Sequence, residues 1–240
     1  MYLVVIPDYE GRASRDGFVA EVLDACHHDP RVHVAVVVNG GTENQRRGAA
    51  ATNANHGRSC TTVTTSAGFN TAVLAGVRTA INLGADRVVR IDTAEHPLTQ
   101  IMASFAMLDD ADVVVRDLVF DERTLRSGTA DEYHNLEVIP TLLSRFTGGA
   151  LSLTGAHGFM GFRGELLAAV VTEVENLLAR AEATRDTQLM WGIDTALAVV
   201  AERSGCRVNV EAIPATVLRD RSTAKCAQQL HDTLDLMLAL

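Results

Sequence analysis

Short apolar runs of strand length alternate with stretches of helical spacing through much of this 240-residue chain. The apolar runs, which predict buried strands, cover residues 2–7, 32–39, 60–65, 86–93 and 113–115. Apolar residues spaced three and four apart predict helices over 16–28, 68–84 and about 97–110. This alternation is typical of a mostly parallel sheet covered by helices on both faces. The sequence therefore predicts an α/β fold.

The second half of the chain has longer helical patterns and fewer apolar runs. It predicts a strand over 207–213 and helices over about 165–185, 191–204 and from about 224 onwards. Two polar stretches without a period, residues 40–59 and 119–148, predict loops, the second a functional loop or lid. No internal repeat or linker composition interrupts the chain, so we predict a single domain.

The composition excludes several broad classes of protein. The formal net charge is −9, whereas broad nucleic-acid binding needs a basic surface. The four cysteines form no Cys-x-x-Cys pair, which argues against a zinc knuckle or a secreted disulfide framework. The first apolar run ends at Pro7, and no apolar stretch approaches the roughly 18 residues that span a bilayer. We expect a cytoplasmic protein with no transmembrane segment and no nucleic-acid partner.

The segment from Val88 to Pro97 contains the first candidate for ligand chemistry. Its apolar run ends at Asp92, and polar residues and a proline follow. Open α/β folds bind ligands beyond the carboxyl ends of their strands, so Asp92 is a candidate binding residue. The alternative is that Asp92 caps the helix that begins near Pro97. Position 94 is alanine, which offers no donor atom to a metal.

Several segments, taken in order, resemble those of one enzyme family. They are Val4–Tyr9, Gly68–Ala72 with Gly76, Arg78 and Ala80, Asp92, Trp191–Asp194, Ala201–Val208, Ala212–Pro214 and Arg219–Lys225. With them the chain resembles the family 2 glycosyltransferases of the GT-A fold, above all the dolichol- or polyprenol-phosphate mannose synthase branch. The resemblance implies a Rossmann-like nucleotide-sugar-binding half over 1–118. It also implies an acceptor half with a C-terminal phosphate-binding segment over 119–240.

The resemblance further implies a donor site for a nucleotide-diphosphate sugar. The residues that it assigns to this site are Pro7, Tyr9, Glu10, Asn39, Gly68, Asp92, Arg219, Arg221 and Lys225. Asn39 stands where the family usually carries acids at the end of its second strand, so the sequence leaves open whether the nucleotide is uridine or guanosine diphosphate. Asn39 and the glycines after it also suit a plain turn. The three cations likewise suit either a diphosphate or a solvated surface.

A divalent cation is the usual partner of such a donor, and the resemblance implies Mg2+ or Mn2+. Asp92 matches the first acid of the family's Asp-x-Asp metal motif, whereas Ala94 replaces the second. A further ligand of the polyprenol branch falls on His96, whose imidazole suits Mn2+ better than Mg2+. We hypothesise that Asp92 and His96 hold the metal, with water or Glu95 in the remaining place.

An inverting transfer needs a carboxylate base near the acceptor hydroxyl, and Asp194 is the candidate. The alternative is that Asp194 is a helix N-terminal acid favoured by the macrodipole. The sequence does not identify the acceptor, which we expect to be a small molecule or a lipid phosphate. It is also compatible with a protein that forms homo-oligomers.

Together these observations predict a nucleotide-sugar-dependent glycosyltransferase (a hexosyltransferase) with metal assistance. The missing second acid motivates the alternative of a catalytically degenerate GT-A-like protein that binds a nucleotide sugar or a partner protein without transfer. A nucleotidyltransferase on a similar scaffold fits less well, because no Gly-rich loop with an early lysine follows the first strand.

Overall fold

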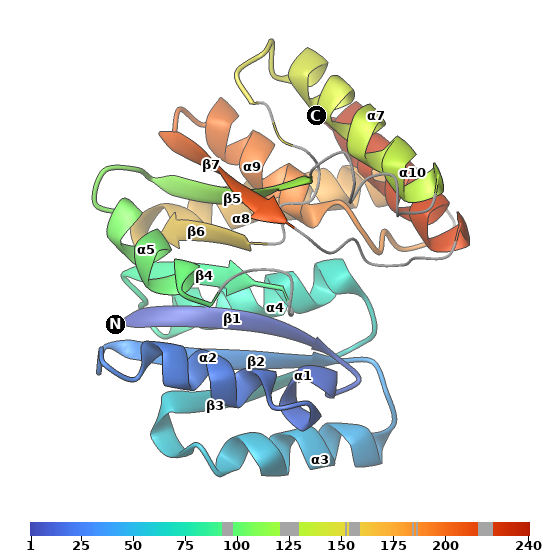
Figure 1. Ribbon diagram of the computed structural model, residues 1–240. Helices are drawn as coiled ribbons and strands as arrows, with labels where there is room; N and C mark the ends of the chain where they lie inside the picture. The colour runs from blue at the N-terminus through green and yellow to red at the C-terminus, as the bar shows by residue number, and fades with distance from the viewer. Residues whose placement is uncertain are drawn as a thin grey trace.

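The computed structural model describes residues 1–92, 98–120, 130–151, 153, 159–183, 185, 187–215 and 223–240. Its strands are β1 (Tyr2–Tyr9), β2 (Val32–Asn39), β3 (Cys60–Thr65), β4 (Arg87–Ile91), β5 (Val113–Phe120), β6 (Phe159–Arg163) and β7 (Val208–Ala215). They form one seven-stranded sheet in the order β3-β2-β1-β4-β6-β5-β7 (Figure 1). Strand β6 runs antiparallel to both of its neighbours, and the other pairs are parallel. The prediction of a mostly parallel sheet is confirmed.

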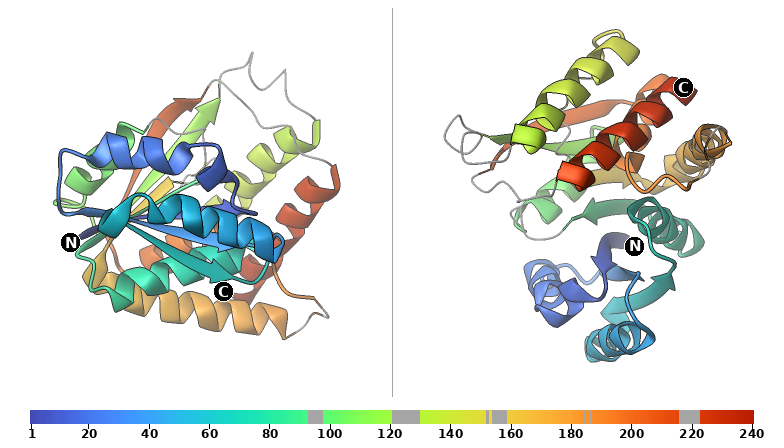
Figure 2. Two further views of the ribbon diagram at one scale, coloured as in Figure 1. Left: turned by 90° about the horizontal axis from the view of Figure 1, so that it is seen from below. Right: turned by 90° about the vertical axis from the view of Figure 1, so that its right-hand side faces the viewer.

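The helices are α1 (Arg12–Arg15), α2 (Phe18–Cys26), α3 (Glu43–Ala54), α4 (Phe69–Asn82), α5 (Gln100–Met107), α7 (Ala130–Phe146), α8 (Gly164–Glu182), α9 (Ile193–Arg203) and α10 (Thr223–Ala239), with a 3-10 turn at Gly57–Ser59. Helices α4, α8 and α9 cover one face of the sheet, and α2 and α5 cover the other (Figures 1 and 2). Helices α7 and α10 pack side by side beyond the β5–β7 half of the sheet. No described helix is both long and apolar enough to cross a membrane.

Successive residues of β1 show how the sequence builds a core on both faces of the sheet. Leu3 and Val5 belong to the cluster under α4, α8 and α9, whereas Val4 and Ile6 belong to the cluster under α2 and α5. All four side chains are fully buried. Each such side chain stabilises the fold by about 1.5–3 kcal/mol through the hydrophobic effect. The central strands are therefore apolar at nearly every position until their carboxyl ends.

The expected loop over 40–59 is wrong, because most of it forms helix α3. Thr42 caps this helix: its hydroxyl accepts a hydrogen bond from the Gln45 backbone (3.3 Å), and the Gln45 side chain accepts one from the Thr42 backbone (2.7 Å). An ion pair between Glu43 and Arg47 (2.9 Å) supports the first turn. Only Ala49 and Asn53 of α3 are buried. The helix therefore lacks the apolar stripe by which a helix can be predicted from the spacing of apolar residues in a sequence.

The expected loop over 119–148 is also wrong where it is described. Strand β5 continues to Phe120, and helix α7 covers 17 residues that include Pro140. Buried Ile139 and Leu143 of α7, one helical turn apart, join the core cluster on the α4–α8–α9 face. Proline in a helix interior removes a backbone hydrogen-bond donor, so Pro140 argues against a helix here when the sequence alone is considered. The expected division of the chain after residue 118 falls inside β5, so both halves contribute to one sheet.

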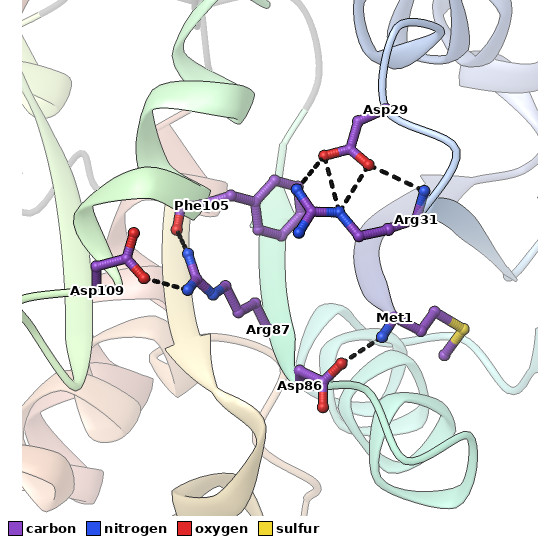
Figure 3. Close-up of polar contacts among 7 residues, drawn as sticks. All are labelled: Met1, Asp29, Arg31, Asp86, Arg87, Phe105 and Asp109. Carbon is purple, nitrogen blue, oxygen red and sulfur yellow. Dashed lines mark hydrogen bonds and ion pairs between the residues drawn. The ribbon is translucent and has the colours of Figure 1, made fainter.

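Ion pairs hold the amino-terminal edge of the sheet together (Figure 3). The guanidinium of Arg87, at the start of β4, donates to the Phe105 carbonyl and to Asp109. The amino group of Met1 contacts Asp86, just before β4. These contacts join the beginnings of β1 and β4 to helix α5.

A cleft of about 590 Å³ opens at this amino-terminal edge beside Arg87 and Arg163. Arg163 donates to the backbone carbonyls of Leu108 (2.8 Å) and Asp109 (2.6 Å). Both guanidinium groups are thus engaged in holding the fold. The candidate site residues lie at the opposite, carboxyl-terminal edge.

Candidate functional site at the carboxyl edge of the sheet

The carboxyl ends of β1, β2 and β4 bring several of the predicted site residues to one edge of the sheet. Tyr9 lies opposite Asn39 in the parallel pairing of β1 with β2. Asp92 follows directly after β4, which is itself parallel to β1. The structure therefore places Tyr9 and Asn39 at the ends of their strands and Asp92 just after its own, all at the edge where open α/β folds bind their ligands.

The turn after β1 leaves Tyr9 about half exposed, with the Arg12 guanidinium 5.7 Å from the centre of its ring. Pro7 is buried within the strand, whereas Tyr9 is 53% exposed. Glu10 adopts a left-handed conformation (φ 57°) and donates its backbone N–H to the Asn39 carbonyl (2.9 Å). A Cβ at Gly40 would lie 3.2 Å from the Tyr9 ring, so glycine is needed there for the ring to take this position. The backbone of both turns is therefore shaped around Tyr9.

Asp8, which is not among the predicted site residues, holds the backbone of this turn in place. Its fully buried carboxylate accepts hydrogen bonds from the Ala13 backbone (2.7 Å) and from the Ser14 backbone (3.1 Å) and hydroxyl (2.7 Å). Burial raises the pKa of Asp8, and these hydrogen bonds oppose that shift. Asn53 of α3 donates to the same Ser14 hydroxyl (3.0 Å). Asp8 therefore acts as a structural acid that sets the path from β1 into α1.

Asn39 connects the end of β2 to the beginning of α4. Its side-chain amide is buried and donates to the Gly68 carbonyl (3.2 Å). Gly68 precedes the helix with φ 130°, a conformation that favours glycine. The side chains of Thr71 and Met190 lie within 3.6 Å of where a Gly68 Cβ would stand. Asn39 and Gly68 are thus brought together, as expected of two residues of one site.

The segment before α9 is held in place by two polar side chains that sequence reasoning missed. Asn70 donates to the carbonyls of Leu189 and Trp191 (3.0 Å each) and accepts the Ile193 backbone N–H (3.2 Å). Fully buried Asp232 of α10 accepts the backbone N–H groups of Met190 (2.9 Å) and Trp191 (3.2 Å). Asn70 is the polar exception among the buried residues at the start of α4, which is the signal that could have identified it. These contacts fix where Trp191 and the following Asp194 stand.

Asp194 lies in the first turn of α9, and its carboxylate meets the buried guanidinium of Arg90 (2.5 Å). Burial raises the pKa of Asp194 to about 6, an effect that Arg90 opposes and the charge of Asp92 reinforces. Asp92 is therefore close enough to Asp194 for their charges to interact. The structure joins the predicted base and the predicted metal ligand in one electrostatic group.

Two aromatic rings and a lysine lie against this group. Phe69, the first residue of α4, stacks on Trp191 with a centroid separation of 5.3 Å. The Lys225 ammonium lies 5.1 Å from the centre of the Trp191 ring. Lys225 lies in the first turn of α10. Of the three predicted phosphate-binding cations, it is the one within the described residues. Arg219, Arg221 and His96 lie outside the described residues.

The described residues offer few donor atoms to a divalent cation. Among the described residues, no three His, Cys, Asp or Glu side chains gather as a metal-binding group. Mg2+ is commonly held by one or two carboxylates together with substrate phosphates rather than by an all-protein cage. A single carboxylate at Asp92, partly exposed just after β4, fits such a substrate-dependent site.

No protein-family model and no curated protein sequence matches the chain. Among solved structures, it is similar to glucosyl-3-phosphoglycerate synthase from Mycobacterium tuberculosis with Mn2+, UDP and glucosyl-3-phosphoglycerate (TM-score 0.60, 14% identity, 100% of this chain and 79% of that chain). The same enzyme with Mn2+, UDP-glucose and phosphoglyceric acid matches with a TM-score of 0.59 at 15% identity, over 99% of this chain and 79% of that chain.

A protein from Desulfovibrio desulfuricans, assigned to the nucleotide-diphospho-sugar transferases, matches 99% of this chain and 96% of its own (TM-score 0.52, 10% identity). These structures and the present one share the central mixed sheet with helices on both faces. The chain has the GT-A fold of nucleotide-diphosphate-sugar transferases.

Proposed function

We propose that this protein is a glycosyltransferase, a hexosyltransferase of the family 2 type, that moves a sugar from a nucleotide-diphosphate sugar to an acceptor. The observation that carries the proposal is the ion pair between Asp194 and Arg90, which stands two residues before Asp92 near the carboxyl end of β4 in a GT-A sheet. A carboxylate for a metal-bound diphosphate and a carboxylate for an acceptor hydroxyl are the two groups that such a transfer requires.

In the proposed donor site, the exposed ring of Tyr9 stacks on the nucleotide base. Pro7 and Glu10 shape the strand end and turn that hold this ring, and Asn39 supports the nucleotide site by fixing the end of β2 to Gly68. Gly68 lets the backbone at the start of α4 approach the diphosphate, where the positive helix end favours an anion. Support for this placement comes from the exposure of Tyr9 and from the hydrogen bond between Asn39 and Gly68.

We assign Asp92 and His96 as the candidate ligands of Mg2+ or Mn2+. When bound, the cation would offset the negative charge of the diphosphate as the sugar leaves. Arg219, Arg221 and Lys225 are proposed to bind the same phosphates, since arginine pairs with phosphate through two hydrogen bonds and lysine acts as a point charge. These cations would stabilise the leaving nucleoside diphosphate directly.

Asp194 is proposed to accept the proton of an acceptor that presents a hydroxyl; an acceptor that is already a phosphate needs no strong base, and Asp194 would then be structural. A raised pKa suits this role, because a base whose pKa lies near the working pH is still ionised and is a better proton acceptor than an ordinary carboxylate. The new glycosidic bond forms between the acceptor oxygen and the sugar carbon, while the bond to the diphosphate breaks. The diphosphate leaves with the bonding electrons.

The acceptor is proposed to be a small molecule or a lipid phosphate. The resemblance of the sequence to the dolichol- or polyprenol-phosphate mannose synthase branch favours the lipid phosphate. The fold that is shared with a synthase crystallised with phosphoglyceric acid favours a small phosphorylated acid. The cytoplasmic location and the association into homo-oligomers stay predictions of the sequence.

A thermal-shift screen tests the proposed function. UDP, GDP, UDP-glucose and GDP-mannose are each added with Mn2+, with Mg2+ or with a chelator. Ligand at about 100 times its Kd stabilises a protein by about 2.7 kcal/mol, which for a chain of this length raises Tm by roughly 5–10 °C. We expect a metal-dependent rise of this size with at least one nucleotide. The absence of any rise would contradict the proposal.

The same samples separate the enzyme from a degenerate binding protein, which Ala94 makes the second candidate. Free sugar released slowly from the stabilising nucleotide sugar identifies the enzyme, since water replaces the acceptor. Stabilisation without any release of nucleoside diphosphate, even in the presence of small phosphorylated acids or polyprenol phosphate, identifies the binding protein.

A further inference from the structure

Arg90 is a fully buried cation in the apolar layer between the sheet and its helices. Its side chain is 1% exposed, and it projects from β4 two residues before Asp92. Its Nη2 atom meets the Asp194 carboxylate, whereas Nε and Nη1 have no hydrogen-bond partner among the described residues. Buried charges are normally paired and hydrogen-bonded at all their donor positions. The Arg90 guanidinium is therefore unusual and calls for an explanation.

The surroundings of Arg90 direct its charge towards one partner. The Asp194 carboxylate lies 2.5 Å from its Nη2, and the centre of the Phe69 ring lies 5.4 Å from its Cζ. Phe69 and Asp194 belong to the first turns of α4 and α9. The positive end of α9 adds to the positive charge of Arg90 beside this carboxylate. The Arg90 guanidinium and one helix end thus lie next to one anion.

Stability alone does not account for Arg90. A buried ion pair is weak evidence for stability, because desolvation of two charges offsets their attraction and apolar replacements of similar volume often do as well. The neighbours of Arg90 on β4, Val88, Val89 and Ile91, are all apolar and fully buried. An apolar residue at position 90 would continue that pattern. A role in the chemistry of the adjacent site is the alternative.

The geometry of Asp194 shows what Arg90 contributes. The Oδ1 atom of Asp194, which faces Arg90, is buried, yet 18% of the Asp194 side chain is exposed. The exposed part of the side chain therefore lies away from Arg90. A carboxylate held through one oxygen keeps the other oriented, in the way that the partner of a catalytic base orients it.

We infer that Arg90 is a positioning residue for the transfer reaction: its guanidinium holds one oxygen of Asp194, so that the other faces the acceptor hydroxyl. This inference rests on the proposed function. It adds a residue to the site that touches neither the donor nor the acceptor and acts through Asp194.

Variants at position 90 test the inference by steady-state hydrolysis of UDP-glucose, or of GDP-mannose if only that donor binds. A displacement of about 1 Å in a catalytic group can cost about 100-fold in rate, so Arg90→Met should lower kcat by about that factor. KM for the nucleotide sugar should change less than threefold. Arg90→Lys keeps the positive charge but loses the planar guanidinium, so its kcat should lie between those of wild type and Arg90→Met. The matched control is Arg78→Met, at an exposed arginine that pairs with Glu175 on the outer side of α4.

Formate provides a readout that a purely structural role would not affect. Asp194→Ala leaves room for a small carboxylate beside Arg90, and added formate should restore part of the lost kcat. The double variant Arg90→Met/Asp194→Ala should show no restoration, because the guanidinium that holds the formate is gone. Should Arg90→Met fail to fold, Arg90→Lys carries the kinetic test, and Arg90→Lys/Asp194→Ala replaces the double variant with weaker rescue expected.

The outcomes separate the inference from the proposed function. A wild-type protein that binds no nucleotide sugar overturns both. Normal donor binding together with an unchanged kcat in Arg90→Met overturns the inference alone. So does equal rescue by formate with and without Arg90. A fall in kcat at constant KM, with rescue that requires Arg90, supports it.

Discussion

Replacement of Asp194 by asparagine should lower the turnover of a nucleotide sugar by about 10²- to 10⁴-fold, the usual contribution of a general base. Asparagine keeps the shape of the side chain but does not accept a proton. KM for the donor should stay close to that of wild type, because the proposed donor contacts come from other residues. The measurement is the release of glucose from UDP-glucose with Mn2+.

The Asp194→Asn variant needs an assay temperature below its unfolding and a matched control. Asp194→Asn removes the counter-ion of buried Arg90, so the variant should be less stable and must be assayed well below its unfolding temperature. Asp24→Asn, at a carboxylate that is 88% exposed, is the matched control and should be fully active. Retention of more than a tenth of the wild-type turnover in Asp194→Asn would remove Asp194 from the role of base.

The pH profile follows from the same residue. Because burial raises the pKa of Asp194 to about 6, the free enzyme should lose kcat/KM as the pH falls through that value and the carboxylate takes up a proton. At higher pH the carboxylate is ionised and the profile should be level until another group titrates. The acidic limb should be absent from the residual activity of Asp194→Asn.

Replacement of Gly164 by alanine should cause a large loss of stability. Gly164 begins α8 and donates its backbone N–H to the Asp86 carbonyl (2.8 Å). A Cβ at this position would lie 1.7 Å from the Ala85 carbonyl oxygen, which is backbone and has little freedom to move aside. Overpacking of this kind costs about 3 kcal/mol, which for a chain of this size lowers Tm by roughly 6–12 °C.

Gly48→Ala is the control of opposite sign. Gly48 lies inside α3, is exposed, and has no atom within 4 Å of an added Cβ. Alanine in a helix interior is favoured over glycine by about 1 kcal/mol, so this variant should raise Tm slightly. Thermal unfolding followed by circular dichroism measures both. A Gly164→Ala variant as stable as wild type would show that α8 does not approach β4 as closely as described.

The parts of the fold that could be predicted from the sequence are those in which burial dictates the residue pattern. The central strands and helix α4 are apolar on every face or stripe that meets the core, and their predicted bounds differ from the observed ones by a few residues. Gly84 was expected to end α4, and its φ of 62° places it there. Helix α3 was missed because a capping box and an ion pair, rather than an apolar stripe, stabilise it.

The site could be predicted only in part, for a related reason. Residues at strand ends, such as Tyr9, Asn39 and Asp92, are marked by the change from apolar to polar character. Asn70 and Asp232 lie inside helices and carry no such mark, and their partners are backbone groups far away along the chain. Asp8 does stand at a strand end, but its structural role appears only in its contacts with Ala13 and Ser14. The charge of Arg90 inside an apolar strand was visible, but its partner Asp194 is brought to it only by the packing of α9.

The central claim is that the carboxyl edge of the sheet, and not the amino edge, binds the nucleotide. Asp86 and Asp92 flank the same strand, β4, at its two ends, so Asp86→Asn and Asp92→Asn form a matched pair. Isothermal titration with UDP or GDP in the presence of Mn2+ measures their affinities. We expect Mn2+ to bind measurably only together with the nucleotide, since Asp92 is the one described carboxylate assigned to it.

In that titration, Asp92→Asn should weaken metal-dependent nucleotide binding at least tenfold, a loss of about 1.4 kcal/mol. Asp86→Asn should bind as the wild-type protein does. Equal affinity in Asp92→Asn and wild type, or a loss confined to Asp86→Asn, would contradict the account.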